Sequence, residues 1–148
     1  MILLPDTGIL DKLCHSNKTV NSPLSLWLEG LLEDEFAHRV ILPEICDYEL
    51  RRKLLHLLAK GQTSERSIRR LDELSQQLEY LPVGTEAFQL AANLWAIART
   101  KGLPTAPEQS LDGDVILAAQ ASLVGGTVVT TNPKHLERFV PSADWTDI

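Results

Sequence analysis

The sequence predicts a three-layer α/β/α fold with a central, mainly parallel sheet of four to five strands. Short apolar runs of strand type alternate with longer segments in which apolar residues recur at helical spacing. The runs at 2–4 and 40–42 are apolar throughout, as strands covered on both faces usually are. Alternating strands and helices imply parallel strands joined by right-handed crossovers. The length of 148 residues suits one domain, which we expect to span residues 1–148.

The predicted strands are short and rich in apolar or β-branched residues. They comprise residues 2–4, 40–42, 79–83, 127–130 and 143–148. Pro5 marks the end of the first strand, because proline cannot donate a hydrogen bond to a sheet. The last strand carries Trp145 and is expected at an edge of the sheet.

Helix boundaries are predicted from capping and breaking residues. A short helical turn over 9–13 is followed by a polar segment, 14–21, which is predicted to be a loop. Ser22-Pro23 is expected to start a helix, because serine caps helices and proline suits the first turn, where no N–H is needed. Pro43 is expected to start another helix, and Gly61 to end it. Further helices are expected to begin at Thr63 or Ser64, at Thr85, at Asp112 and at Asn132-Pro133, with a loop over 102–110.

The composition excludes several classes of protein. The net charge of −6 argues against a general binder of polyphosphates, although a basic patch or a divalent cation can reverse the sign locally. No glycine-rich dinucleotide motif follows the first strand, and the sequence contains no P-loop. The apolar stretches are too short to span a membrane. Cys14 and Cys46 form no Cys-x-x-Cys pair, so we expect reduced thiols and a cytoplasmic protein.

Four polar residues are predicted to gather where strands are followed by helices. Asp6 ends the first strand, and Asn132 follows the fourth. Glu49 lies early in its helix, and Asp114 lies in the first turn of a helix that is otherwise apolar. Ligands of open α/β sheets bind at the carboxyl ends of the strands. We therefore expect these four side chains to form one site.

The residue types of this site favour a hard divalent cation. Clustered carboxylates repel one another, which raises their pKa values unless a cation compensates. Mg²⁺ or Mn²⁺ suits an all-oxygen site, whereas the cysteines and histidines are too few and too poorly placed for zinc. Mg²⁺ usually completes its coordination shell with substrate phosphate. This chemistry predicts a metal-dependent hydrolase of phosphodiesters.

Each of these residues also has a purely structural interpretation. Asp6 suits a helix cap, Asp114 suits a helix N-terminus, and Asn132 suits an N-cap before Pro133. Glu49 suits an ion-pair face that it would share with Asp47, Arg51 and Arg52.

The roles of several neighbouring residues stay open. Asp112 is either a helix cap or an acid that supports the site from outside. Thr7 and Thr130 are candidates to hydrogen-bond the acids. Arg51 and Arg52 are either part of a solvated face or contacts for substrate phosphates. The histidines are scattered, and none is assigned a catalytic role.

Four segments of the chain, in their order, resemble the PIN-domain family and in particular its VapC-type toxin ribonucleases. These segments are Leu3-Leu-Pro-Asp-Thr-Gly-Ile-Leu10, Leu42-Pro-Glu-Ile-Cys-Asp-Tyr-Glu-Leu50, Asp114-Val-Ile-Leu-Ala-Ala-Gln-Ala121 and Val128-Val-Thr-Thr-Asn132. The resemblance implies that Asp6, Glu49 and Asp114 bind Mg²⁺ or Mn²⁺. It also implies endonucleolytic cleavage of RNA, restraint by a partner antitoxin, and a homodimer.

Three residues depart from the pattern of this family. Pro5 stands where the family usually has an apolar residue, and Gly8 replaces a frequent Asn or Ser. Asn132 replaces a frequent Asp, which removes one negative charge. The leading hypothesis is thus a metal-dependent endoribonuclease, the toxin of a toxin–antitoxin pair. The alternatives are a weakly active or inactive PIN-fold module that binds RNA or protein, and a phosphatase or nuclease that acts on DNA or flapped substrates.

Overall fold

The computed structural model describes residues 1–34, 36–101 and 108–148. Five strands are present in this part of the chain: β1 (Ile2–Pro5), β2 (Arg39–Pro43), β3 (Glu79–Leu81), β4 (Thr127–Thr130) and β5 (Ser142–Asp144). The helices of the first half are α1 (Thr7–Cys14), α2 (Lys18–Glu33), α3 (Glu44–Ala59) and α4 (Glu65–Gln77). The second half contributes α5 (Thr85–Thr100), α6 (Glu108–Val124), α7 (Pro133–Leu136) and the short 3₁₀ helix η1 (Trp145–Asp147).

The strands form one parallel sheet in the order β3-β2-β1-β4-β5. The chain moves outward from β1 to β3, then returns to the other side of β1 to form β4 and β5. The direction of winding therefore reverses between β1 and β4. In open α/β sheets, the carboxyl ends of the strands at such a reversal are the usual ligand site. Asp6 directly follows β1, and Thr131 directly follows β4.

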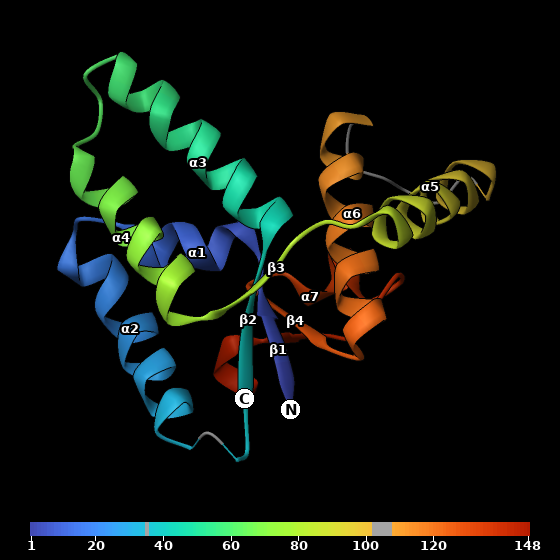
Figure 1. Ribbon diagram of the computed structural model, residues 1–148, viewed down its shortest axis with the longest axis horizontal. Helices are drawn as coiled ribbons and strands as arrows, with labels where there is room; N and C mark the ends of the chain where they lie inside the picture. Colours follow the sequence, from blue (N-terminus) through green and yellow to red (C-terminus); the bar gives the residue numbers. More distant parts are fainter. Residues whose placement is uncertain (35, 102–107) are drawn as a thin grey trace.

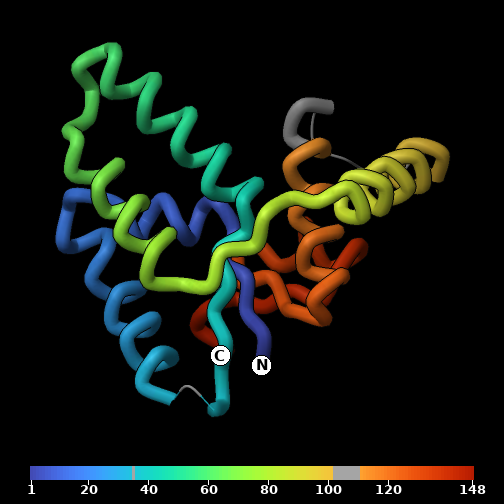
Figure 2. Tube along the Cα trace, viewed as in Figure 1, coloured from blue at the N-terminus to red at the C-terminus, as the bar shows by residue number. Residues whose placement is uncertain are grey.

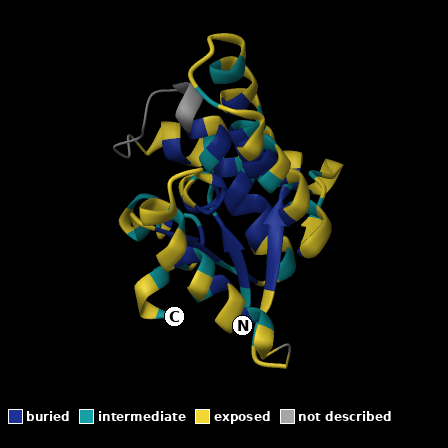
Figure 3. Ribbon diagram, turned by 90° about the vertical axis from the view of Figure 1, so that its left-hand side faces the viewer, coloured by how far each residue is buried: buried dark blue, intermediate teal, exposed yellow. Residues whose placement is uncertain are grey.

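Helices cover both faces of the sheet, so the predicted three-layer fold with a parallel sheet is confirmed. Figure 1 shows α1 to α4 on one side of the strands and α5 to α7 on the other. The paired helices α5 and α6, yellow and orange in Figure 2, project on the side opposite to the blue and green helices. Buried residues concentrate in the central strands and on the inner faces of the helices (Figure 3). No helix in the described ranges is both long and apolar enough to cross a membrane.

The start of α2 was predicted wrongly. The sequence suggested a loop over 14–21 and a helix start at Ser22-Pro23, but α2 begins at Lys18 and contains Pro23. Asn17 is the cap, because its side-chain oxygen accepts a hydrogen bond from the backbone N–H of Thr19 at 2.9 Å. The loop that remains between α1 and α2 is three residues long, 15–17.

The start of α6 also differs from the prediction. The helix is already present at Glu108, and part of the expected loop, 102–107, lies outside the described residues. Leu111 is fully buried, and it packs with Val115 and Ala119 against α5. The additional helical turn brings Leu111 into this apolar stripe, since the three residues are four apart. Asp112 is thus inside the helix and is not its cap.

The C-terminal strand is shorter than predicted. β5 ends at Asp144, and Trp145 belongs to η1. The side chain of Asp144 accepts hydrogen bonds from the backbone and hydroxyl groups of Thr146, which turns the chain out of the sheet. Trp145 then meets Trp27 edge to face, with ring centroids 6.3 Å apart.

Gln120 is a buried polar residue that joins three elements. Its side chain, 1% exposed, accepts a hydrogen bond from the N–H of Ile45 at 3.4 Å and donates one to the carbonyl of Leu81 at 2.8 Å. These contacts attach α6 to the start of α3 and to the end of β3. The position of α6 relative to α3 matters for the site, because Asp114 and Glu49 lie on these two helices.

Candidate active site

The four residues predicted to form a site line one cavity at the carboxyl ends of the strands. The cavity has a volume of about 420 Å³. Its acidic and amide residues are Asp6, Glu49, Asp114 and Asn132. The rest of its wall consists of Thr7, Gly8, Arg52, Gly113, Leu117, Thr130, Thr131, His135 and Leu136. Residues from α1, α3, α6 and the segment after β4 thus meet where the sheet reverses its winding.

Asp6 both caps α1 and faces the cavity. Its Oδ1 accepts a hydrogen bond from the N–H of Ile9 at 2.9 Å. Burial raises the pKa of Asp6, while hydrogen bonds from the Thr130 side chain and from backbone N–H groups lower it. Asp6 is thus a helix cap, as the structural interpretation of this residue predicted. This does not exclude a second role, because the cap uses only one of the two carboxylate oxygens.

Glu49 lies in the second turn of α3 and is oriented by residues outside that helix. The hydroxyl of Thr7 donates a hydrogen bond to Oε1 of Glu49 at 2.8 Å. A Cβ at Gly113 would lie only 2.5 Å from Oε2 of Glu49, so the carboxylate rests against the backbone of α6. Glycine at this position leaves the space that the Glu49 carboxylate occupies.

Asp114 is in the second turn of α6, beyond the first turn where the helix dipole acts most strongly. Its Oδ2 lies 2.7 Å from Nε2 of His135. Burial raises the pKa of Asp114, the nearby His135 lowers it, and the charge of Glu49 raises it. Electrostatic repulsion therefore acts between the carboxylates of Asp114 and Glu49, which lie on neighbouring helices.

Asn132 and Asp112 differ in their relation to the cavity. Asn132 is the N-cap residue of α7, but its side chain makes no capping hydrogen bond, and it lines the cavity. Its backbone N–H donates to the hydroxyl of Thr130 at 3.1 Å. Asp112 is exposed and lines a neighbouring cavity instead.

The two adjacent arginines of α3 have different surroundings. The guanidinium of Arg51 forms ion pairs with Asp47 at 3.0 Å and with Asp72 at 2.7 Å. Asp47 also accepts a hydrogen bond from the Tyr80 hydroxyl at 2.6 Å, so Arg51 belongs to a network that joins α3, α4 and β3. Arg52 is exposed and lines the cavity. Of the two candidates for phosphate contact, the structure places only Arg52 in the wall of the cavity.

The donor set of the cavity fits a hard divalent ion by its chemistry. Three carboxylates and one amide present oxygen atoms of the kind that such an ion prefers, and burial raises the pKa values of Asp6 and Asp114, a cost that a cation would offset. Within the described ranges, however, no three His, Cys, Asp or Glu side chains are close enough to enclose an ion directly. Binding therefore requires the carboxylates to move closer together, or water molecules to complete the shell, as Mg²⁺ commonly allows.

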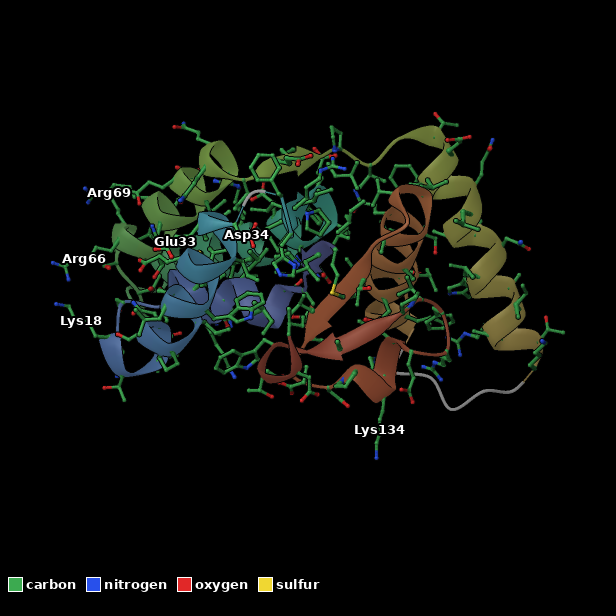
Figure 4. All side chains as sticks on the ribbon, turned by 90° about the horizontal axis from the view of Figure 1, so that it is seen from below. Lys18, Glu33, Asp34, Arg66, Arg69 and Lys134 are labelled. Carbon is green, nitrogen blue, oxygen red and sulfur yellow. The ribbon has the colours of Figure 1, made fainter. Side chains whose placement is uncertain are left out.

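His135 and Gly113 are site residues that the sequence reasoning missed. His135 was counted among scattered histidines, although it lies three residues after Asn132 and thus one helical turn further along α7. That spacing was the available signal. Lys134, between these two residues, points outward into solvent (Figure 4). Gly113 carried no signal, because its role depends on the approach of Glu49 from a different helix.

Comparisons with known proteins identify the family of this chain. A family model for the PIN domain matches residues 4–139, which is most of the chain, so the protein belongs to the PIN-domain family. The predicted resemblance is thereby confirmed. No curated protein sequence matches this chain at a significant level.

Solved structures described as VapBC and FitAcB share the fold. VapBC-1 from nontypeable Haemophilus influenzae superposes with a TM-score of 0.72 at 22% identity, covering 99% of both chains. VapBC2 from Rickettsia felis, bound to a DNA fragment from its promoter, gives 0.71 at 20% identity over 98% of this chain and 99% of that one. FitAcB from Neisseria gonorrhoeae gives 0.70 at 24% identity over 100% of both. At these identities the likeness establishes a shared fold.

Proposed function

We propose that this protein is a Mg²⁺- or Mn²⁺-dependent endoribonuclease that acts as the toxin of a toxin–antitoxin pair in the cytoplasm. The observation that carries the proposal is the convergence of Asp6, Glu49 and Asp114 on one cavity at the carboxyl ends of the strands. These residues are far apart in the chain, and two of them have pKa values raised mainly by burial. Such an arrangement costs free energy in the absence of a cation, so a functional explanation is required.

The residues of the cavity have distinct roles in this proposal. Asp6, Glu49 and Asp114 hold the ion, and Thr7 and Thr130 orient the Glu49 and Asp6 carboxylates through the hydrogen bonds described above. Asn132 contributes its side-chain carbonyl or holds a water molecule. Arg52 binds a phosphate of the substrate. When bound, a divalent ion lowers the pKa of water and offsets negative charge on the phosphate.

The partners follow from the family and from its neighbours. The solved structures are described as VapBC, FitAcB and FitAB. We propose a cognate antitoxin protein and a homodimer for this chain as well. RNA is the proposed substrate.

Cleavage assays on the purified protein, freed of any bound antitoxin, test the activity. RNA is expected to be cut with Mg²⁺ or Mn²⁺ and left intact with a chelator, while DNA is left intact under both conditions. The variants Asp6→Asn and Asp114→Asn are expected to lose at least a hundredfold in rate, because each removes a charged ligand. The exposed Asp147→Asn is the matched control. Full activity in the two site variants would rule out this assignment.

A second candidate is a PIN-fold module that binds RNA or a protein without cutting. It is favoured by the neutral Asn132 in the cavity and by the finding that no three acidic, histidine or cysteine side chains of the described part already enclose an ion site. Calorimetric titration with Mn²⁺ distinguishes the two candidates. Mn²⁺ binding that disappears in Asp114→Asn supports the nuclease candidate. Absence of binding at Mn²⁺ concentrations on the order of millimolar, which is the range of weak protein sites, supports the non-cutting module.

A further inference from the structure

We propose that Tyr48 and Arg52 form a nucleotide subsite beside the candidate active site, in which Arg52 binds a phosphate and the Tyr48 ring stacks on a base of single-stranded RNA. This inference rests on the proposed function and extends it to the way in which substrate is held. The subsite is the second cavity next to the acidic one, with a volume of about 520 Å³. It is lined by Ile45, Tyr48, Glu49, Arg52, Asp112, Gly113 and Ile116.

The two cavities adjoin each other. Glu49, Arg52 and Gly113 line both of them, so a polymer whose phosphate lies among the acids enters the second cavity with its next nucleotide. A volume of this size accommodates a nucleobase and its sugar, since ordinary small-molecule sites begin near about 300 Å³. Continuity with the acidic cavity makes the substrate itself the natural occupant.

Arg52 supplies the positive charge on this path. Its side chain is exposed, and it makes no ion pair with an acid in the described ranges, in contrast to Arg51 with its two carboxylate partners. Because Arg52 lines both cavities, it stands at the boundary between them, where one phosphate would link the two nucleotides. Arginine binds phosphate through paired N–H groups and also stacks on planar rings.

Tyr48 supplies the aromatic surface. It is one helical turn before Arg52 on α3, and the Arg52 guanidinium carbon lies 5.1 Å from the centre of the Tyr48 ring. The side chain of Tyr48 remains 56% exposed, although tyrosine is normally more buried than this. Exposed aromatic rings next to arginines are the recurring platform on which single-stranded nucleic acids stack their bases.

The charge distribution favours a base over a phosphate deep in this cavity. Glu49 and Asp112 contribute carboxylates to its wall, and these repel a second phosphate but not a neutral base. We therefore place the phosphate at Arg52 and the base against Tyr48. A protein segment docked by apolar contacts is the competing occupant, and RNA affinity that is unchanged in both Tyr48→Ala and Arg52→Ala would overturn RNA as the occupant.

The test combines protein variants with single-stranded RNA that lacks one base. Binding of a short fluorescent RNA is measured by anisotropy with Ca²⁺ in place of Mg²⁺, and a single abasic position is moved along the RNA. Wild-type protein is expected to lose about tenfold in affinity at one position, and Tyr48→Ala to lose about tenfold on intact RNA. The two changes are expected not to add, because both remove the same stacking contact.

Matched variants separate stacking from other effects. Tyr48→Phe is expected to keep the affinity, and Tyr48→Leu to lose it, since leucine preserves apolar surface without a ring. Arg52→Ala is expected to weaken binding and its salt dependence together. Phe36→Ala and Arg66→Ala are the controls: Phe36 is an exposed aromatic near the amino end of β2, and Arg66 points outward from α4 (Figure 4).

The outcomes distinguish this inference from the proposed function. Cleavage of RNA with additive losses from the abasic position and Tyr48→Ala overturns the subsite alone. RNA binding with non-additive losses but without cleavage supports the subsite and overturns the nuclease. Full RNA affinity in Tyr48→Leu overturns stacking on the Tyr48 ring. Absence of both cleavage and binding for any RNA overturns both proposals.

Discussion

Nε2 of His135 lies 2.7 Å from Oδ2 of Asp114, which joins α7 to α6 across the candidate active site. The two side chains are partly shielded from water, with exposed fractions of 37% for His135 and 21% for Asp114. Groups that orient a metal-binding carboxylate typically affect metal affinity by about 10- to 100-fold. His135→Ala is thus expected to weaken Mn²⁺ binding at least about tenfold, as measured by calorimetry.

His56→Ala is the control for this prediction, because His56 is exposed on α3. It is expected to bind Mn²⁺ with the wild-type affinity. Unchanged binding in His135→Ala would show that the contact with Asp114 does not support the ion.

Gly113→Ala is expected to damage the site without unfolding the protein. The added Cβ would lie 2.5 Å from Oε2 of Glu49, so this carboxylate must move out of its position. Alanine is intrinsically better than glycine in a helix by up to about 1 kcal/mol, which offsets part of the strain in stability measurements. We expect RNA cleavage to fall at least about tenfold and the melting temperature to change by only a few degrees, roughly.

Gly30→Ala provides the comparison for this variant. Gly30 lies in α2, and a Cβ there meets nothing within 4 Å. The substitution is expected to stabilise the protein by about 0.5–1 kcal/mol and to leave cleavage unchanged. Equal activity in Gly113→Ala and Gly30→Ala would contradict the role of the close approach between Gly113 and Glu49.

Asp6→Asn is expected to stabilise the metal-free protein at neutral pH. Burial raises the pKa of Asp6 above 3.8, so the folded state binds a proton more tightly than the unfolded state. Stability from this group is thus fully present below the unfolded pKa and is lost as the pH rises through the folded pKa. Asparagine removes that loss and still caps α1. A higher melting temperature than that of wild type is expected in thermal unfolding with a chelator at about pH 7.

The same measurement contains its own controls. As the pH is lowered toward the unfolded value of 3.8, the advantage of Asp6→Asn over wild type is expected to shrink, because the wild-type carboxyl then gains its proton in the folded state. Asp144→Asn is expected not to stabilise, since hydrogen bonds from Thr146 lower the pKa of Asp144. Addition of Mn²⁺ is expected to raise the melting temperature of wild type and not that of Asp6→Asn. A metal-free Asp6→Asn that is less stable at about pH 7 would refute the argument.

Gln120→Leu is expected to cost about 2 kcal/mol of folding free energy. The substitution keeps the buried volume roughly constant but leaves the N–H of Ile45 and the carbonyl of Leu81 without their side-chain partner. Chemical denaturation measures the loss, and the exposed Gln76→Leu on α4 is the control. A stability equal to that of wild type would mean that the buried amide is not required for the attachment of α6.

Much of the fold is predictable from local pattern, because buried parallel strands and amphipathic helices have distinct periods. The error at α2 has a local cause, since Ser22-Pro23 is a good start signal but Asn17 offers an earlier cap. The turn of α6 before Asp112 depends on the packing of Leu111 against α5, which is a tertiary contact. Such contacts are not visible in a single sequence.

The candidate site, too, is predictable where its residues follow a local pattern and not where they depend on tertiary contacts. Asp6, Glu49 and Asp114 each stand at a recognisable place in the chain, and the structure brings them to one cavity. Nothing in the sequence distinguishes Arg51 from Arg52 as a phosphate contact. In the structure, Arg51 forms ion pairs with Asp47 and Asp72, whereas Arg52 lines the cavity. His135 and Gly113 were missed because their partners come from other helices.

The strand order has a consequence for synthesis on the ribosome. β1 is the central strand, and its neighbour β4 is translated more than a hundred residues later. The edge of β1 that pairs with β4 therefore has no partner strand for most of translation. The wall formed by residues 130–136 joins the other side chains only after nearly all of the chain has emerged. A nascent or truncated polypeptide therefore carries the first carboxylates without the rest of the cavity, so the candidate active site is complete only after β4 and α7 have been translated.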